Sequence, residues 1–469
     1  MAIKITFLGA SKQVTGSRYF LEAGGLKLLI DCGLFQEREY QSRNWDAFPF
    51  DPAKLDAVVL THAHLDHVGT LPRLVDQGFT DKPILATEPT VELAALVMLD
   101  SGRIQEEDAK YKLKRHRKKG HKGPHPVVPL YTVEQAQRTV PLLKGYPYDK
   151  PLTLNENVTL TFIEAGHILG SASLLFEIKD NNEIRKVVFS GDIGQHGKPL
   201  IRDPGKIDTA EIVVMESTYG DRNHRDAGPV DVQLERIIND TFKRGGNVII
   251  PTFAIERAQE LMYHISELAY ADKIPDVPVF MDSPMAVDAT EIFKRYRGYM
   301  DDETVAMFDK HEPPLRFPGL TLVRNVEESK AIKLRTTPSI IMSSSGMCTA
   351  GRIKHHLKNN ITDPNSTILF VGFQAQGTLG RRLVQGEKEV RIHGEMWPVN
   401  ARIEQIHGFS GHGDQEDLLN WLAQMDPSPH RVFLTHGELE SAEVLEKILH
   451  ERYPHMNIKI PSYQHTVEI

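Results

Sequence analysis

Four side chains that commonly bind metals stand close together in the segment 61–67. They are His62, His64, Asp66 and His67. The apolar run 55–60 before them predicts a buried parallel strand, and residues 68–75 after them predict the first turns of a helix. In open α/β sheets ligands bind at this edge, where strands end. Ordinary packing explains a lone histidine, but not four such residues in one strand-to-helix loop, so we interpret the loop as a metal site.

The spacing within this loop could serve two metal ions. His62 and His64 are two residues apart, so in extended chain their imidazole rings point the same way. Asp66 and His67 follow the turn of the chain and can face a second point. Imidazole and carboxylate ligands suit zinc, and they do not exclude manganese or iron.

The order His-x-His-x-Asp-His after a strand resembles the signature of the metallo-β-lactamase superfamily. The resemblance implies an αββα sandwich with a mono- or dinuclear metal site, and His64 speaks against the di-iron branch, which usually has glutamate there. Three other strand ends resemble further motifs of the superfamily. By this resemblance Asp31 supports the metal-binding histidines, which need such an acceptor, while His167 completes the first metal's ligands and Asp192 bridges both metals. Each aspartate could also be a plain turn residue.

Length and composition indicate a soluble globular enzyme with two domains, or with one domain that carries a large insertion. The chain has 469 residues, of which 25% are charged and 40% hydrophobic, without a disorder signature. The net charge of −8 gives no global basic field for nucleic acid. Two cysteines make no disulfide framework, residues 1–9 predict a strand rather than a signal peptide, and no stretch approaches a membrane span. We therefore expect a cytoplasmic protein with no membrane partner.

The pattern of elements changes after residue 217. Before it, residues 3–60 predict short strands with Gly24-Gly25 as a hairpin turn. After it, strands and helices alternate, which predicts a mainly parallel, doubly wound sheet with its own core. We expect strands at 247–251, 277–281, 339–342 and 367–372, and helices at 232–244, 256–269, 286–296 and 350–360.

A strongly basic run, residues 110–122, follows a helix expected from Val91 toward Arg103. Such runs are usually solvated, mobile loops. This one could also attract a polyanion locally. The sequence leaves both readings open.

Two strand-to-helix turns in the second region have phosphate-binding character. Their small residues let backbone N–H groups and hydroxyls converge on an anion. Glycine-rich turns are common in α/β folds, so ordinary turns are the alternative. The candidate phosphate-binding residues are Ser343, Ser344, Ser345, Gly377 and Thr378.

Three later motifs resemble those of the β-CASP group, the nucleic-acid-cleaving members of the superfamily. This group is related to the endonuclease of eukaryotic mRNA 3′-end processing and to bacterial ribonucleases J. The motifs are Val-Met-Glu-Ser-Thr-Tyr-Gly with Glu216, Phe-Ser-Gly-His-Gly-Asp with His412, and Leu-Thr-His-Gly-Glu with His436. The resemblance covers essentially the whole chain. It implies an α/β protein in which a β-CASP domain, residues 218–395, is inserted between parts 1–217 and 396–469 of a metallo-β-lactamase domain.

The resemblance also implies the roles of the site residues. Two Zn²⁺ per chain are expected, with Mn²⁺ as an alternative. His62, His64 and His167 would hold one metal, and Asp66, His67 and His436 the other, with Asp192 between them. Asp66, Glu216 and His412 would be catalytic: His412 would protonate the leaving sugar oxygen and Glu216 would orient it.

The expected function is a two-zinc ribonuclease that hydrolyses single-stranded RNA to 5′-phosphate and 3′-hydroxyl ends. It would act as an endonuclease, with 5′-exonuclease activity and a homodimer left open. Because water is the nucleophile, the mechanism does not separate RNA from DNA, so a DNA nuclease is an alternative. A small-molecule hydrolase would leave the inserted domain and His412 without a purpose. A non-catalytic RNA-binding scaffold is disfavoured because every expected ligand is present.

Overall fold

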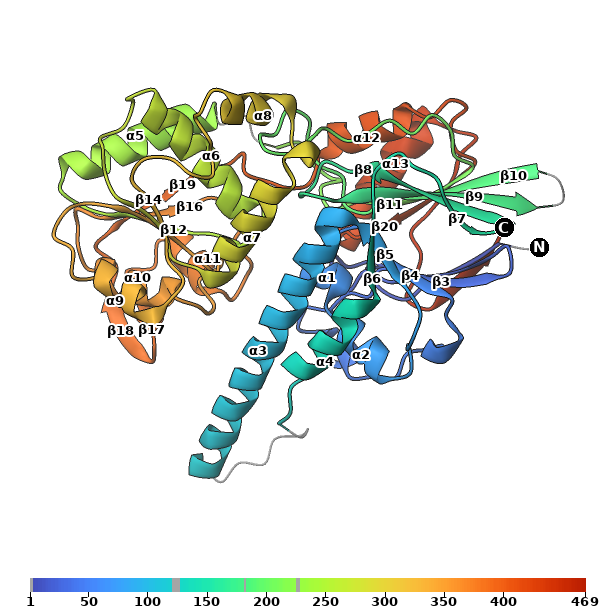
Figure 1. Ribbon diagram of the computed structural model, residues 1–469, viewed down its shortest axis with the longest axis horizontal. Coiled ribbons are helices and arrows are strands. Elements are labelled where there is room, and N and C mark those ends of the chain that lie inside the picture. The colour runs from blue at the N-terminus through green and yellow to red at the C-terminus, as the bar shows by residue number, and fades with distance from the viewer. Residues whose placement is uncertain (1–2, 120–126, 181–182, 225–227) are drawn as a thin grey trace. The chain divides into compact units, whose positions relative to one another are not determined.

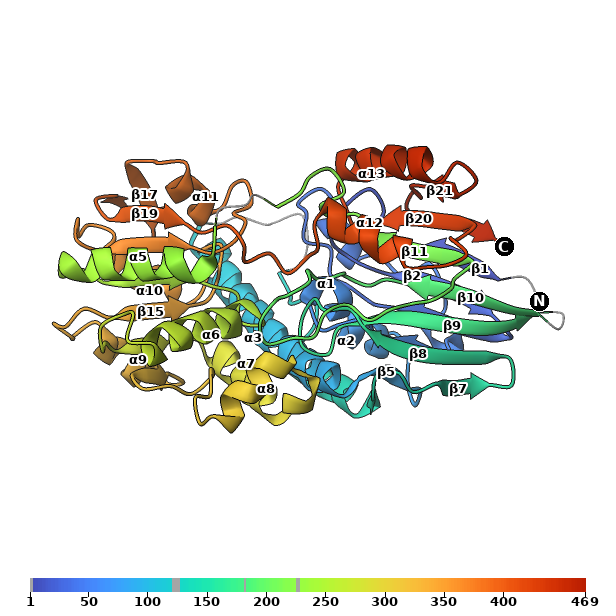
Figure 2. The same ribbon diagram turned by 90° about the horizontal axis from the view of Figure 1, so that it is seen from above.

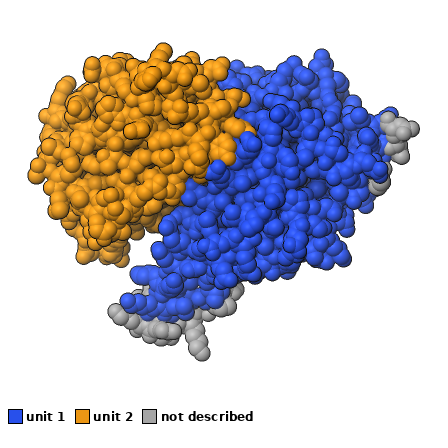
Figure 3. Space-filling view, in the orientation of Figure 1, with its two compact units in different colours: residues 1–196, 203–223, 412–469 blue, residues 197–202, 224–411 orange. Residues whose placement is uncertain are grey.

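The computed structural model describes residues 3–119, 127–180, 183–224 and 228–469. It divides into two compact units (Figure 3). Unit 1 comprises residues 1–196, 203–223 and 412–469, and unit 2 comprises residues 197–202 and 224–411. Residues 396–411, expected in the metallo-β-lactamase part, belong to unit 2, because β19 (Arg402–Gln405) pairs with β16 (Thr367–Phe370) of that unit.

In the described residues, unit 1 is built on two seven-stranded sheets (Figures 1 and 2). The first has the order β22 (His465–Glu468), β1 (Lys4–Phe7), β2 (Tyr19–Ala23), β3 (Leu26–Ile30), β4 (Ala57–Val59), β5 (Ile84–Thr87) and β6 (Leu143–Tyr146). The second has the order β21 (Asn457–Lys459), β20 (Arg431–Thr435), β11 (Ile212–Glu216), β10 (Glu183–Phe189), β9 (Ala172–Asp180), β8 (Val158–Glu164) and β7 (Leu152–Asn155).

Helices and two apolar cores complete unit 1. The described helices are α1 (Leu65–Val68), α2 (Leu71–Asp76), α3 (Glu88–Lys119), α4 (Val133–Thr139), α12 (Gln415–Ala423) and α13 (Leu439–Arg452). Facing side chains of the two sheets, among them Phe7, Phe162 and Phe433, form one core. A second core joins the second sheet to α12 and α13 through Trp421 and Leu445. The layers are those of the expected αββα sandwich, which is confirmed.

The loop that carries the first ligands lies where the sequence predicted it. Strand β4 pairs in parallel with both β3 and β5, and α1 begins directly after the loop. Helix α2 carries Pro72 in its first turn, where a missing N–H does no harm. The hairpin turn at Gly24-Gly25 also lies as predicted, since β2 and β3 are antiparallel neighbours.

Unit 2 holds a six-stranded sheet in the described residues, and all its neighbouring strands are parallel. The order is β14 (Leu320–Leu322), β13 (Val279–Met281), β15 (Ile340–Ser343), β12 (Val248–Pro251), β16 and β19. The helices are α5 (Val230–Lys243), α6 (Arg257–Tyr270), α7 (Pro284–Arg295), α8 (Asp302–Asp309), α9 (Val326–Ile332), α10 (Ile353–Asn360) and α11 (Leu379–Val384), and a hairpin of β17 (Glu389–Ile392) and β18 (Glu395–Pro398) follows. The predicted parallel sheet is confirmed.

The basic run does not form the expected loop. Helix α3 continues to Lys119, so residues 110–119 are its last turns, and Figure 1 shows them running past α4. Lysine and arginine are good helix formers, and no glycine or proline interrupts residues 103–119. Residues 120–122 lie outside the described part. Neither α3 nor any other described helix is long and apolar enough to cross a membrane.

Candidate metal centre and histidine–glutamate pair

Every predicted ligand and catalytic side chain of unit 1 lies at or just beyond the end of a strand, or in a loop packed against one. Asp31 follows β3, the histidine loop follows β4, His167 follows β8, Asp192 follows β10, Glu216 ends β11 and His436 follows β20. Asp31 and His436 have φ angles of +56° and +49°. A left-handed backbone is uncommon for such residues and is held here by backbone hydrogen bonds, from Asp31 to Val59 and from His436 to Ala10.

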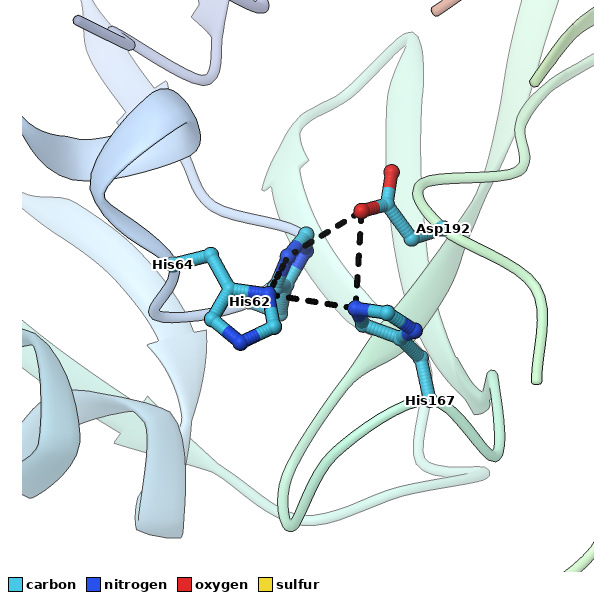
Figure 4. Close-up of side chains that lie close together, drawn as sticks. All are labelled: His62, His64, His167 and Asp192. Atoms are coloured by element: carbon cyan, nitrogen blue, oxygen red, sulfur yellow. Dashed lines mark hydrogen bonds and ion pairs between the residues drawn. The ribbon is translucent and has the colours of Figure 1, made fainter. Parts of the chain in front are cut away.

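Four donor atoms converge on the first candidate metal position (Figure 4). The Nδ1 atom of His64 lies 3.1 Å from the Nε2 atom of His62 and 3.1 Å from that of His167. Asp192 Oδ2 lies 3.4 Å from His62 Nε2 and 3.5 Å from His167 Nε2. These donors come from strand ends of both sheets.

Three further side chains converge on a second position, and the other oxygen of Asp192 reaches it. The Nε2 atoms of His67 and His436 lie 3.2 Å apart. Asp66 Oδ2 lies 3.5 Å from His436 Nε2, and Asp192 Oδ1 lies 3.4 Å from His67 and 3.5 Å from His436. Asp192 thus offers one oxygen to each group, as a bridging ligand would.

The donor set fits metal ions. With bonds of about 2.0–2.2 Å, the donors of a tetrahedral site lie about 3.3–3.6 Å apart, which is close to the separations above. Asp192 Oδ1 is buried and accepts no hydrogen bond. A buried carboxylate oxygen without a hydrogen bond is costly unless a cation satisfies it. The structure therefore brings all seven predicted ligands together in an arrangement suited to two cations.

The surroundings set the charge of these ligands. Burial, together with the neighbouring His67 ring, holds the pKa of His62 well below its ordinary value, and burial lowers the pKa of His64 to about 4. Burial alone would raise the pKa of Asp192, but the imidazoles of His436 and His67 hold it well below its usual range. Burial opposes a charged ring at His67 and His436 as well, but the Asp192 carboxylate outweighs it and raises the pKa of both, so metal binding there would displace protons.

Outer partners fix the orientation of the ligand rings. Asp31 Oδ2 lies 2.7 Å from His67 Nδ1, which leaves Nε2 of His67 to face the second position. Asp31 is itself held by the backbone N–H and the hydroxyl of Thr61, each at 2.8 Å. The Thr218 hydroxyl lies 3.1 Å from His436 Nδ1 and donates to the His436 carbonyl. Thr61 and Thr218 were not predicted from the sequence, although each stands at a strand end near a predicted ligand, which was the available signal.

Replacing Asp31 by asparagine should weaken metal binding. Asparagine tolerates the left-handed backbone and keeps the shape, but its neutral amide is a weaker acceptor for the His67 ring. We expect a loss of about 10–100-fold in metal affinity, typical for outer partners of metal ligands. Competition with a chromophoric chelator measures it. An unchanged affinity would contradict the supporting role of Asp31.

His412 and Glu216 form a pair beside the metal cluster. Both Glu216 oxygens lie 3.1 Å from His412 Nδ1, and His412 Nε2 lies 3.9 Å from Asp192 Oδ2. The loop of His412 is fixed because the Gly413 N–H donates to the Ile193 carbonyl and Gln195 donates to the His412 carbonyl.

The pair has the charge and access that a proton donor needs. Burial opposes a charged ring, but the Glu216 and Asp192 carboxylates outweigh it and raise the pKa of His412 to about 9. The His412 side chain is 21% exposed, whereas His62, His67 and His167 are at most 2% exposed. His412 therefore presents a protonatable ring beside the cluster, and its side chain is more exposed than those three histidines.

The predicted phosphate-binding residues lie in unit 2 and differ in access. Ser343 is buried, and its hydroxyl donates to the Asp282 carbonyl at 2.8 Å. The Thr378 hydroxyl caps α11 by accepting from the Arg381 N–H. Ser344 and Ser345 are half-buried, and Gly377 has a φ of +82°. Phosphate binding by these turns stays a prediction, and the buried hydroxyl of Ser343 is already engaged within the fold.

The buried carboxylate of Asp282 holds the segment that follows β15 in place. Asp282 accepts hydrogen bonds from Arg352 at 2.7 Å, His356 at 2.6 Å and Ser329 at 2.6 Å. Arg352 and His356 lie at the start of and within α10, so Asp282 ties that helix to the end of β13.

Replacing Asp282 by alanine should lower the free energy of unfolding of unit 2 by about 3–5 kcal/mol, because Arg352 loses its buried counter-charge and His356 and Ser329 lose their hydrogen-bond acceptor. Burial alone would raise the pKa of Asp282, but the hydrogen bonds lower it, so this stabilisation exists above the unfolded pKa of about 4 and is lost as pH falls below it. Urea unfolding at neutral pH measures the change. The control Asp288→Ala removes an exposed carboxylate paired with Arg324 and should cost under about 1 kcal/mol. Equal losses would contradict the role of Asp282.

Three families match successive stretches of the chain. Residues 13–235 match the metallo-beta-lactamase superfamily, and residues 258–383 match the Beta-Casp domain. Residues 396–461 match the Zn-dependent metallo-hydrolase RNA specificity domain.

Individual proteins are similar along nearly the whole chain. Ribonuclease TTHA0252 of Thermus thermophilus is 38% identical over 95% of this chain and 96% of its own length. Transcription termination factor FttA of Methanosarcina mazei is 33% identical over 93% of this chain and 67% of its own length. The crystal structure of a protein of unknown function from Enterococcus faecalis aligns with this chain over 100% of both, with a TM-score of 0.59 and 12% identity. This similarity shows a shared fold alone. The chain carrying this cluster belongs to the β-CASP group of the metallo-β-lactamase superfamily, and it is a metal-dependent hydrolase.

Proposed function

We propose that this protein is a two-zinc ribonuclease that cuts single-stranded RNA internally and leaves 5′-phosphate and 3′-hydroxyl ends. The carrying observation is the bridging position of Asp192, with one oxygen toward each group of donors. Its similarity to Ribonuclease TTHA0252, and to a family described by RNA specificity, supports RNA as the substrate.

The chain's own residues divide the work of hydrolysis. When bound, two divalent metals lower the pKa of water and neutralise charge on the phosphate. Water adds to phosphorus and gives up a proton to solvent, the bond between phosphorus and the 3′-oxygen breaks, and the 3′-oxygen leaves with a proton from Nε2 of His412, which then regains a proton from solvent. Glu216 holds Nδ1 of His412 and thereby directs Nε2 toward the reacting phosphate. The water oxygen stays on the 5′-phosphate.

Zinc is the metal that this donor set favours. The donor set offers imidazole nitrogens and carboxylate oxygens at tetrahedral spacing, without thiolate. Manganese accepts the same ligands less tightly. Elemental analysis of the purified protein, together with reconstitution by each metal, identifies the ion.

The test compares one RNA labelled at its 5′ end with the same RNA labelled internally, each with and without chelator. Internal cuts that stop with chelator and return with zinc are the expected result. Release of single nucleotides from the 5′ end would show exonuclease action instead. A single-stranded DNA of the same sequence is run in parallel, and faster cutting of DNA would overturn the substrate assignment.

A further inference from the structure

Two phenylalanine side chains stand exposed on neighbouring loops of unit 2. Phe253 follows β12 and is 43% exposed, and Phe373 follows β16 and is 63% exposed. Because β12 pairs in parallel with both β15 and β16, the loops after all three strands meet at one edge of the sheet. Ligands bind α/β sheets at this carboxyl edge. We call this feature the Phe253/Phe373 edge.

The fold holds the loops of this edge against one another. A Cβ atom at Gly346 would lie 2.9 Å from Cδ2 and 3.0 Å from Cε2 of Phe253, so the ring packs directly on a glycine. Gln374, next to Phe373 in the chain, is buried and donates to the Gly346 carbonyl at 3.1 Å and the Gly372 carbonyl at 3.3 Å. The loop after β15 is thus joined to both loops that carry the rings.

The charge around the rings suits a polyanion. The three loops, residues 252–256, 344–352 and 371–378, contain one acidic side chain, Glu256, and it is buried, although the protein as a whole carries a net charge of −8. Arg381, in the first turn of α11 directly after the third loop, has no ion-pair partner within the residues that the structure describes. Its neighbour Arg382 is instead held by Glu387 at 2.6 Å.

We propose that the Phe253/Phe373 edge binds single-stranded RNA by stacking nucleobases on the two rings. The inference rests on the proposed function and adds a substrate-binding site in unit 2. Every base has a π-face, so such stacking binds RNA without reading its sequence. Because the one acidic side chain of these loops, Glu256, is buried, the phosphate backbone meets no exposed carboxylate on them.

Binding to RNA with and without bases tests this proposal directly. The protein is the full, metal-loaded chain with His412→Ala, which keeps the RNA intact. The first probe is a fluorescein-labelled RNA of about 20 nucleotides, longer than single-stranded sites of about 4–16 nucleotides. The second probe has the same length and label, and abasic residues replace its nucleotides. We expect Phe253→Leu with Phe373→Leu to weaken binding of the first probe about ten-fold or more, since each stacked base contributes that much. The abasic probe should bind both proteins equally.

A matched control separates stacking from general surface changes. Leu334 is 80% exposed in the same unit but precedes β15, so it lies toward the opposite edge of the sheet. Leu334→Ala should leave binding of both probes unchanged. RNA containing 2-aminopurine gives a spectroscopic readout: its fluorescence should fall on binding to the parent protein and fall less on binding to the double variant.

Each other outcome has a definite meaning. If the double variant binds the RNA as tightly as the parent, the stacking site is overturned, while cleavage by the chain with His412 intact upholds the proposed function. If the parent binds no RNA, both inferences fail. If the double variant instead changes the oligomeric state in light scattering with RNA binding unchanged, the edge is an interface between copies of the chain, which overturns the proposal.

Discussion

Replacing His412 by alanine is expected to slow RNA cleavage by about 10²–10⁴-fold, the usual contribution of a general acid. Nε2 of His412 faces the metal cluster, and Nδ1 is held by both oxygens of Glu216. The alanine variant has no proton to give to the leaving 3′-oxygen. Single-turnover cleavage of a labelled RNA measures the loss.

Metal content decides between two uses of His412. A ring nitrogen of His412 and the donor atoms of Asp192 and His436 lie within 4.8 Å of one another, so His412 could also be a metal ligand. A general acid leaves the metals in place when it is removed, whereas a ligand takes a metal with it. We expect elemental analysis to find the wild-type metal content in His412→Ala. His430→Ala, which removes an exposed histidine of unit 1, is the control and should cut at the wild-type rate. Wild-type cutting by His412→Ala would refute the assigned role.

Replacing Asp192 by asparagine is expected to have the other large effect, the loss of at least one metal and of cleavage. The amide offers one neutral oxygen where the carboxylate offers an oxygen to each group of donors, and its NH₂ group cannot bind a cation. Replacing a residue that only supports a metal ligand already lowers metal affinity or activity about 10–100-fold. We therefore expect the loss at the shared ligand to exceed about 100-fold in activity.

Elemental analysis and RNA cleavage are measured on the same preparation of Asp192→Asn. Asp208→Asn is the control, because Asp208 is an exposed carboxylate of unit 1 paired with Lys206. It should keep both metals and full activity. If Asp192→Asn still bound two metals per chain and cut RNA normally, the carboxylate would not bridge the sites.

The sequence predicted which side chains the fold brings together, because these residues follow strands whose pattern is local, while their roles as ligands rest on the family resemblance and stay predictions. The apolar run before His62 and the glycines around His167 and Asp192 mark strand ends, and each ligand is of a type that binds metal. The partners Thr61 and Thr218 were missed, since a threonine at a strand end is common and only the folded distance to Asp31 or His436 distinguishes it.

The sequence was less informative where an element depends on pairing with a distant strand, or where the evidence for a helix is only that no glycine or proline interrupts it. β22 is a short, polar strand with largely exposed residues, and it exists because it pairs with β1 at the other end of the chain. No local pattern encodes that partner. The distal half of α3 was expected to be a loop because its charge lacks an apolar face, but it contains no helix breaker. Exposed Phe253 and Phe373 carry no periodicity, so only the fold shows that their loops lie at the same edge of the sheet.

The late position of β20 in the chain has a consequence for biosynthesis. His436 directly follows β20, and β20 is an inner strand of the second sheet, between β11 and β21. A ribosome therefore has to synthesise and release residues 1–436 before the last predicted donor can join the others. Until then the nascent chain offers six of the seven predicted donors, so the group of Asp66, His67 and His436 stays incomplete during synthesis.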